Sequence, residues 1–130
     1  FFKWNASNDP RTKLEEFRKL LTYDPILEKT VPRLDYAGFS FDPKVGNDHW
    51  ATLAEGTVTV APGNYDLETT TDDGMRVWID GKVVIDDAWK YQGPTAYKRR
   101  LKLGGTHKIR VEHFQIDGYA TLKVELKPVR

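Results

Sequence analysis

The sequence contains no cysteine, and this absence excludes several kinds of protein at once. Without a thiol the chain can form no disulfide framework, no thiolate metal site and no cysteine nucleophile. Long hydrophobic runs are also missing. No stretch approaches the roughly 18 apolar residues of a membrane-spanning helix, so we expect no membrane insertion. The chain lacks an initiating methionine and a signal-like start, and we therefore expect a segment of a longer protein.

A predominant charge of one sign is missing too. Lysine and arginine total 20, and aspartate and glutamate total 19, so no overall field favours nucleic acid or an anionic membrane as a partner. What is present is ordinary for a soluble globular protein: 130 residues, of which 39% are hydrophobic and 30% are charged. This length predicts one domain over residues 1–130, large enough to bury a real core.

One helix is predicted, over residues 10–22. Asp9 is suited to cap it and Pro10 to occupy its first position. Leu14, Phe17 and Leu21 recur at helical spacing and define the face that should be buried.

From about Leu34 onward the hydrophobic period changes to two, which is typical of β-strands. The pattern predicts about eight short strands, with a turn at "APGN" (61–64) and separate strands on either side of Gly104-Gly105. The fold class is therefore all-β: an antiparallel β-sandwich with the N-terminal helix packed on it.

Two acidic turns need separate interpretations. Asp80-Gly81 has the composition of a two-residue hairpin loop, because both residues tolerate positive φ. Asp72-Asp73-Gly74 leaves alternatives open. It is either a solvated turn with positive φ at Gly74, or one part of a site for a hard cation such as Ca²⁺, to which a second loop must contribute. A catalytic pair is disfavoured, because adjacent carboxylates do not face opposite sides of one bond.

The remaining candidates are weaker. His113 shares a strand face with Ile109 and Val111, which favours a core histidine, and the basic run "KRRLK" (98–102) is typical of a solvated strand face. Trp89 and Tyr91 fall beside loops, where a ring suits either the core or a sugar. No nucleophile, cofactor or metal-triad motif is present, so we do not expect an enzyme.

Two stretches in combination resemble the PA14 domain family: "GNYDLETTTDDGMRVWIDGKVVIDDAW" and "LKLGGTHKIRVEHFQIDGYATLKVEL". The resemblance covers roughly residues 48 to 127, which we expect to form the β-sandwich core. Residues 1–47, with the helix at 10–22, are expected to be an N-terminal extension. The family implies a β-sandwich that serves as an extracellular module of toxins, glycosidases and adhesins.

In the lectin-like members of the family, two consecutive aspartates hold a Ca²⁺ that contacts sugar hydroxyls. Carried over to this chain, the pattern implies the metal ligands Asp72, Asp73, Gln115, Asp117 and Tyr119. It implies the carbohydrate-binding residues Asp72, Asp73, Trp89, Tyr91 and Asp117. Gln115 departs from the adhesin pattern, which has asparagine at that place.

The resemblance thus implies a non-catalytic carbohydrate-binding module of a larger extracellular or cell-surface protein. Ca²⁺ would be its cofactor, and its partners would be a glycan or polysaccharide and the other domains of the parent protein. The alternative is a structural or protein-interaction module without a sugar or calcium site, in which Asp72-Asp73-Gly74 is only a turn.

Overall fold

The computed structural model describes residues 1–39 and 42–129. Its elements in chain order are β1 (Phe2–Lys3), the short 3₁₀-helix η1 (Ala6–Asn8), α1 (Leu14–Leu20), β2 (Leu34–Gly38), β3 (Trp50–Asp72), β4 (Gly74–Ile79), β5 (Lys82–Ala88), β6 (Thr95–Gln115) and β7 (Ala120–Pro128). All strand pairs are antiparallel, so the predicted all-β class is confirmed.

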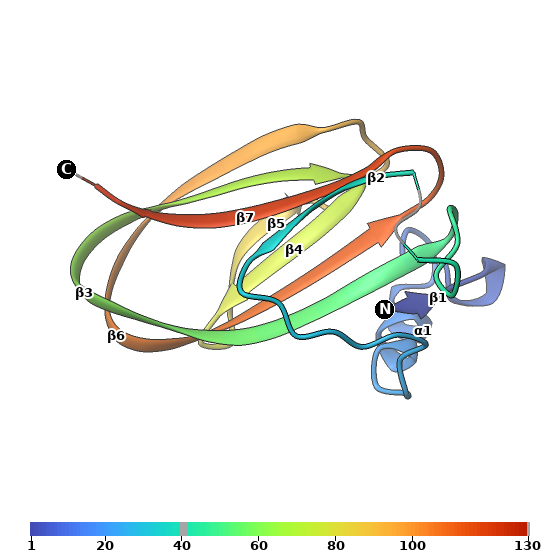
Figure 1. Cartoon of the computed structure of the whole chain (residues 1–130), viewed down its shortest axis with the longest axis horizontal. Helices are drawn as coiled ribbons and strands as arrows, with labels where there is room; N and C mark the ends of the chain where they lie inside the picture. The colour runs from blue at the N-terminus through green and yellow to red at the C-terminus, as the bar shows by residue number, and fades with distance from the viewer. Residues whose placement is uncertain (40–41, 130) are drawn as a thin grey trace.

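Two long strands, β3 and β6, bend together and belong to both layers of the sandwich (Figure 1). Residues 50–60 of β3 pair with residues 105–115 of β6, and β1, β4 and β5 complete this first layer. Residues 63–71 of β3 pair with residues 95–103 of β6, and β7 and β2 complete the second layer. This pair of long strands thus belongs to both sheets of the fold and positions them.

The bend corrects two sequence predictions. β3 runs through residues 61–64, where a turn was expected, and β6 runs through Gly104-Gly105, where two strands were expected. The pairing register shifts between Val60 and Gly63, around Pro62, whose nitrogen has no hydrogen to donate to the ladder. A Cβ on Gly104 would lie 3.1 Å from the Pro62 Cα, so a glycine allows the two backbones to approach. The described residues therefore form seven strands instead of about eight.

Among the described residues, hydrophobic side chains form three buried clusters, of which the smallest contains Val45, Trp50 and Ala120. One core lies between the layers and is formed by buried residues of both, namely Leu67, Met75, Val77, Ile85, Ala88, Val111 and Leu122. A second core lies under α1 and contains Phe2, Trp4, Phe17, Leu21, Ala51, Phe114 and Ile116. Helix α1 therefore packs on the outer face of the first layer, as predicted, at the end of the molecule opposite the bend (Figure 1).

Helix α1 is shorter than the predicted helix. The carboxylate of Asp9 accepts a hydrogen bond from the Arg11 N–H instead of capping the helix. The Asp9 carbonyl accepts from the N–H groups of Thr12 and Lys13, which closes a turn before the helix begins at Leu14. The predicted buried face is correct nonetheless, since Phe17 is fully buried.

The predicted boundary at residue 47 does not separate an extension from the sheet. β2 pairs with β7 over Leu34–Gly38, and β1 pairs with β3 through Phe2 and Lys3. The first 47 residues therefore supply an edge strand of each layer in addition to the helix. None of the helices in the described part of the chain has the length and apolar character needed to cross a membrane.

Candidate functional site

The paired aspartates lie where β3 ends and β4 begins. A cis peptide bond joins Asp72 to Asp73, and the Asp73 side chain is 1% exposed. Its two carboxylate oxygens accept hydrogen bonds from backbone N–H groups, Oδ1 from Gln92 at 3.1 Å and Oδ2 from Ile116 at 2.9 Å. Asp73 therefore joins the loop after β5 to the loop after β6, and the pair is not a solvated turn.

Gly74 follows the pair for a reason that differs from the expected one. Its φ is not positive, contrary to the expectation for a turn glycine. Instead, a Cβ on Gly74 would lie 2.0 Å from the Phe114 Cε2 atom, because the Phe114 ring packs directly against this backbone. The glycine is required by this close approach.

Burial dominates the electrostatics of the pair. Desolvation, followed by the neighbouring Asp73 carboxylate, raises the pKa of Asp72 to about 7. Burial also raises the pKa of Asp73, although its two backbone hydrogen bonds oppose the change. The site therefore holds carboxylates whose negative charge is costly.

His113 supports the pair from inside the sandwich, as the predicted core histidine should. Its Nε2 lies 2.7 Å from the Asp72 carbonyl oxygen, and its Nδ1 lies 2.7 Å from the Tyr36 hydroxyl, which also contacts the Thr52 hydroxyl. Since a carbonyl only accepts, Nε2 carries the proton and Nδ1 accepts from Tyr36. Burial lowers the pKa of His113 to about 4, so the ring is neutral near pH 7.

The second predicted loop, residues 115–119, lies beside the pair, since Asp73 accepts from the Ile116 N–H. Gln115 is fully buried, and its Nε2 donates to the carbonyls of Asp117 and Gly118. Its Oε1 accepts no hydrogen bond within the described part of the molecule. The Asp117 carboxylate accepts from the Tyr91 hydroxyl at 3.2 Å.

The aromatic candidates separate into two groups. Tyr91 and Tyr119 are exposed, at 60% and 44%, and Tyr119 makes an edge contact with Phe39. Trp89 instead packs between Phe17 and Phe114, and its Nε1 donates to the Pro10 carbonyl at 2.9 Å. Trp89 is therefore half-buried against the core under α1, and its ring contacts these residues and the Arg76 guanidinium instead of standing beside the aspartate pair as the predicted carbohydrate platform.

The donor set can be compared with what a hard cation requires. Asp72, Asp73 and the unpaired Gln115 Oε1 offer oxygen atoms of the kind that Ca²⁺ takes. Among residues 1–39 and 42–129, however, no group of three or more histidine, aspartate or glutamate side chains is placed to hold a metal ion. Asp117 therefore does not add a third carboxylate, and a cation here would need carbonyl oxygens. Calcium at this pair stays a prediction.

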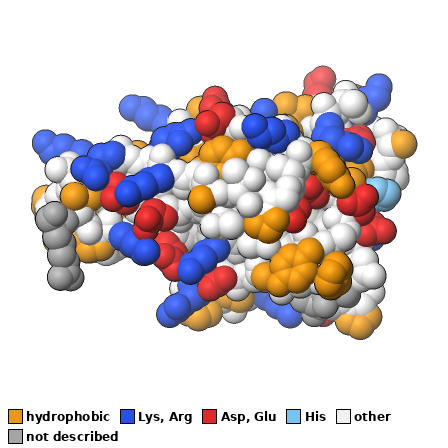
Figure 2. All heavy atoms as spheres, turned by 90° about the horizontal axis from the view of Figure 1, so that it is seen from above, with side chains coloured by type: hydrophobic (Ala, Val, Ile, Leu, Met, Phe, Trp, Pro, Cys, Tyr) orange, Lys and Arg blue, Asp and Glu red, His pale blue; other side chains and the backbone are white. Residues whose placement is uncertain are grey.

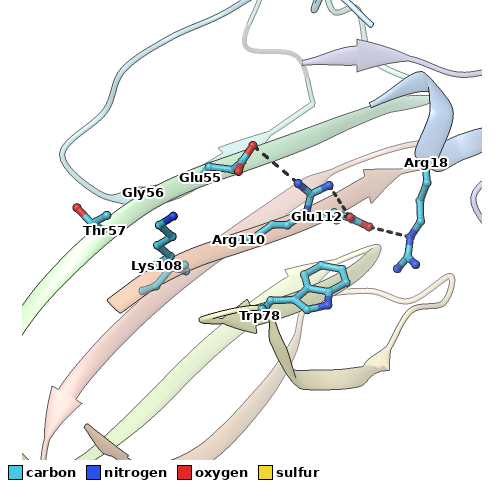
Figure 3. Close-up of a pocket in the computed structure, with 10 residues that line it drawn as sticks. Arg18, Glu55, Gly56, Thr57, Trp78, Lys108, Arg110 and Glu112 are labelled. Atoms are coloured by element: carbon cyan, nitrogen blue, oxygen red, sulfur yellow. Dashed lines mark hydrogen bonds and ion pairs between the residues drawn. The ribbon is translucent and has the colours of Figure 1, made fainter. Parts of the chain in front are cut away.

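Sequence reasoning missed a second polar site on the outer face of the first layer. Trp78 of β4 lies beside Arg110 and Glu112 of β6 and Arg18 of α1 (Figure 3). The sequence did contain a signal, because Trp78 alternates with inward-facing Val77 and Ile79 and is therefore a large ring on an outward strand face.

Two other predictions are confirmed. Asp80 and Gly81 have φ values of 51° and 80°, as the hairpin loop requires, and the Asp80 carboxylate also accepts from the Lys108 N–H. Lys98 and Arg100 of the basic run are exposed and both pair with Asp66. Figure 2 shows acidic side chains interspersed among the basic ones on the face it presents, so no continuous basic surface forms there.

The fold and site together define the class: an antiparallel β-sandwich module with paired aspartates at the end of β3, one of the two long strands that both layers share. The PA14 domain model matches residues 7–130, and the chain belongs to the PA14 domain family. The PA14 domain of the MpAFP antifreeze protein has the same fold, with a TM-score of 0.55 at 20% identity over 60% of this chain and 43% of that one.

Other similar proteins are regulators by name. The anti-sigma-I factor RsgI3 of Acetivibrio thermocellus is 34% identical over 86 residues, which is 64% of this chain and 13% of that protein. A solved structure of an anti-sigma factor domain-containing protein has a TM-score of 0.72 at 28% identity, over 77% of this chain and 36% of that one. A second such structure, from Clostridium clariflavum, has a TM-score of 0.71 at 18% identity, over 82% of this chain and 38% of that one, and shows the fold alone.

These comparisons correct the functional prediction. The implied calcium-assisted carbohydrate-binding module, with a glycan or polysaccharide as its partner, is wrong, as is its description as lectin-like and secreted, because the similar proteins are named as anti-sigma factors. The alternative interpretation, a protein-interaction module, agrees better with those names. The chain spans only 13% of the curated relative, so the similarity concerns one part of a much longer regulator.

Proposed function

We propose that this domain is a regulatory, protein-binding module of a longer protein of the anti-sigma-factor type. The observation that carries the proposal is the 34% identity over 86 residues to the anti-sigma-I factor RsgI3. The 28% identical structure of an anti-sigma factor domain-containing protein supports it. On this proposal, the partner is a signalling protein of the same system that the domain can reach at the cell surface.

The proposal includes a location outside the cell or at its surface. A module that receives a signal there would pass it to the rest of the longer protein. This assignment is compatible with a regulator that senses conditions outside the cell, and it needs no membrane-spanning segment within the domain itself.

The proposal also treats the domain as non-catalytic. The histidine next to the paired aspartates supports this view, because both ring nitrogens of His113 are already engaged, by Tyr36 and by the Asp72 carbonyl. Its pKa of about 4 leaves it a weak base. Asp73 likewise has both carboxylate oxygens bonded to backbone N–H groups.

The test uses the longer protein in cells that carry a sigma-dependent transcription reporter. The domain is replaced by a flexible linker, and the amount of the longer protein is matched by immunoblot. We expect the reporter output to change under the inducing condition. Unchanged output at matched protein level would contradict a regulatory role for the domain.

A further inference from the structure

A pocket of about 730 Å³ lies on the outer face of the first layer. It shares no residue with the cluster around Asp72 and Asp73. Its lining comes from α1, from β3 and β6, and from the β4–β5 hairpin: Arg18, Glu55, Gly56, Thr57, Trp78, Gly81, Lys108, Ile109, Arg110 and Glu112. Helix α1 contributes Arg18 at one end of this face, and Glu55, Gly56 and Thr57 on β3 are exposed (Figure 3).

Strand alternation explains which side chains line the pocket. Val111 and His113 of β6 are buried on the inner side, so Arg110 and Glu112 are directed to the outer face. On the neighbouring strand β4, Val77 is inward and Trp78 is outward and half-buried. A tryptophan beside charged groups is thus held on a rigid sheet.

Glu112 is the unusual member of the group because its side chain is only 2% exposed. Its Oε2 accepts two hydrogen bonds from Arg110, at 3.2 Å and 3.0 Å. Its Oε1 accepts no hydrogen bond among the described residues, and the Arg18 Nε lies 3.7 Å away. A buried carboxylate oxygen without a donor is costly, and a ligand that donates an N–H would remove that cost.

The charged side chains around the Trp78 ring give the pocket a net positive charge. Three cationic side chains, Arg18, Lys108 and Arg110, face two carboxylates, Glu55 and Glu112, for a net charge of one positive. Arg110 is held by both carboxylates, at 3.0 Å from Glu112 and 3.8 Å from Glu55. Lys108 makes no ion pair among the described residues, and Arg18 makes only the longer contact of 3.7 Å with Glu112, so these are the two cations that an incoming anion can recruit.

We infer that this pocket docks an acidic peptide segment of a protein partner. A carboxylate of the segment pairs with Lys108 and Arg18, an N–H donates to Glu112 Oε1, and an apolar side chain packs on the Trp78 ring. The inference rests on the proposed protein-binding function and names the chemistry of the partner. A peptide supplies donors and carboxylates together, whereas the phosphate groups of a nucleic acid would bring only acceptors to Glu112.

The test is a binding assay with the 130-residue chain and two hexapeptide libraries. Each acidic peptide carries two carboxylate residues around one apolar residue, and the matched library has lysine in place of the carboxylates. We expect acidic peptides to bind at least about tenfold more tightly than their lysine counterparts, with affinity falling as salt rises. Equal binding of both libraries would overturn the inference.

Point variants test whether the acidic peptide binds in this pocket. Trp78→Ala and Lys108→Glu should each lower the affinity for the tightest-binding acidic peptide by at least about tenfold. Lys98→Glu is the matched control, since it makes the same charge change at Asp66, outside the pocket. Thermal unfolding checks that each variant is folded.

Three outcomes would overturn the docking site. An equal loss of affinity with Lys98→Glu and Lys108→Glu would show that the peptide is attracted to positive charge anywhere on the surface. Undiminished binding by folded Trp78→Ala and Lys108→Glu variants would place the peptide elsewhere. A dimer in sedimentation that Trp78→Ala dissociates would make a second copy the occupant. If the reporter experiment fails while the pocket binds acidic peptides as expected, the site stands and the regulatory role falls.

Discussion

Gly74 and Phe114 show how closely single residues are fitted where β3 meets β4. The Phe114 ring is fully buried and occupies the space that a side chain at position 74 would need. This ring also contacts Trp89, which connects the backbone beside the paired aspartates to the core under α1. A side chain added at residue 74 would therefore disturb the packing under α1.

We predict that Gly74→Ala lowers the free energy of unfolding by about 1–3 kcal/mol, because the added methyl group displaces the Phe114 ring. Gly56→Ala is the matched control. It also lies in a strand, its φ is not positive, and a Cβ there meets nothing within 4 Å. Urea unfolding of both variants checks this, and equal stability of the two would contradict the packing argument.

His113 makes stability depend on pH. In the unfolded chain its pKa is 6.5, whereas burial lowers it to about 4 in the fold. Between those values the unfolded state binds the extra proton, so stability is lost as pH falls from 6.5 toward 4, by up to about 3 kcal/mol.

The variant His113→Gln should lose this acid-dependent slope. Asp72, with its pKa raised to about 7, acts in the opposite direction, since stability falls as pH rises through that range. The difference between wild type and His113→Gln isolates the histidine. Denaturant unfolding at several pH values measures it, and parallel pH profiles for the two proteins would refute the assignment.

The family resemblance also predicts that the paired aspartates, Asp72 and Asp73, bind Ca²⁺. Isothermal titration of chelator-treated protein should give binding heat in the wild type and none in Asp73→Asn. Asp80→Asn is the control, because Asp80 lies in the exposed hairpin turn. Absence of heat in the wild type up to about millimolar Ca²⁺, a range typical of extracellular sites, would mean that the pair holds no calcium.

At the scale of elements, α1 is attached mainly through one side chain. Phe17 is its only fully buried residue, and the helix has seven residues and no side-chain cap. A helix this short has little stability of its own, so the packing against Trp89 and Phe114 must stabilise it.

We expect Phe17→Ala to cost about 3–5 kcal/mol, through lost burial and the cavity left behind. Tryptophan fluorescence should shift as well, because the Phe17 and Trp89 ring centroids are 5.6 Å apart. Lys19→Ala, on the exposed side of the same helix, should change stability by less than about 0.5 kcal/mol. Equal effects of the two substitutions would show that the helix is not anchored through Phe17.

The elements also show where the sequence was informative. Alternation in β4 and β7, and the Asp80-Gly81 loop, were predictable because each is set by neighbouring residues. The continuity of β3 and β6 was not, because Pro62 and Gly104 suggest turns locally, and only the pairing of the two strands reveals that they bend together. Likewise, Asp9 had the residue type of a helix cap, but its carboxylate bonds to Arg11 and its carbonyl closes a turn before the helix.

The candidate site was predicted in part for the same reason. Asp72, Asp73 and residues 115–119 lie together as the family pattern implies. The core position of Trp89 depends on contacts with Phe17 and Phe114, which are distant in sequence. The pocket at Trp78 combines α1, β3, β4 and β6, so its buried Glu112 could not be found from any one stretch.

At the scale of the whole molecule, the central claim is that the domain regulates a longer protein of the anti-sigma-factor type. The most direct measurement is sigma-dependent transcription in three strains whose longer protein carries the intact domain, lacks it, or carries Trp78→Ala. We predict that loss of the domain changes transcription under the inducing condition, and that Trp78→Ala reproduces the change. Identical transcription with and without the domain, at matched protein levels, would contradict the account.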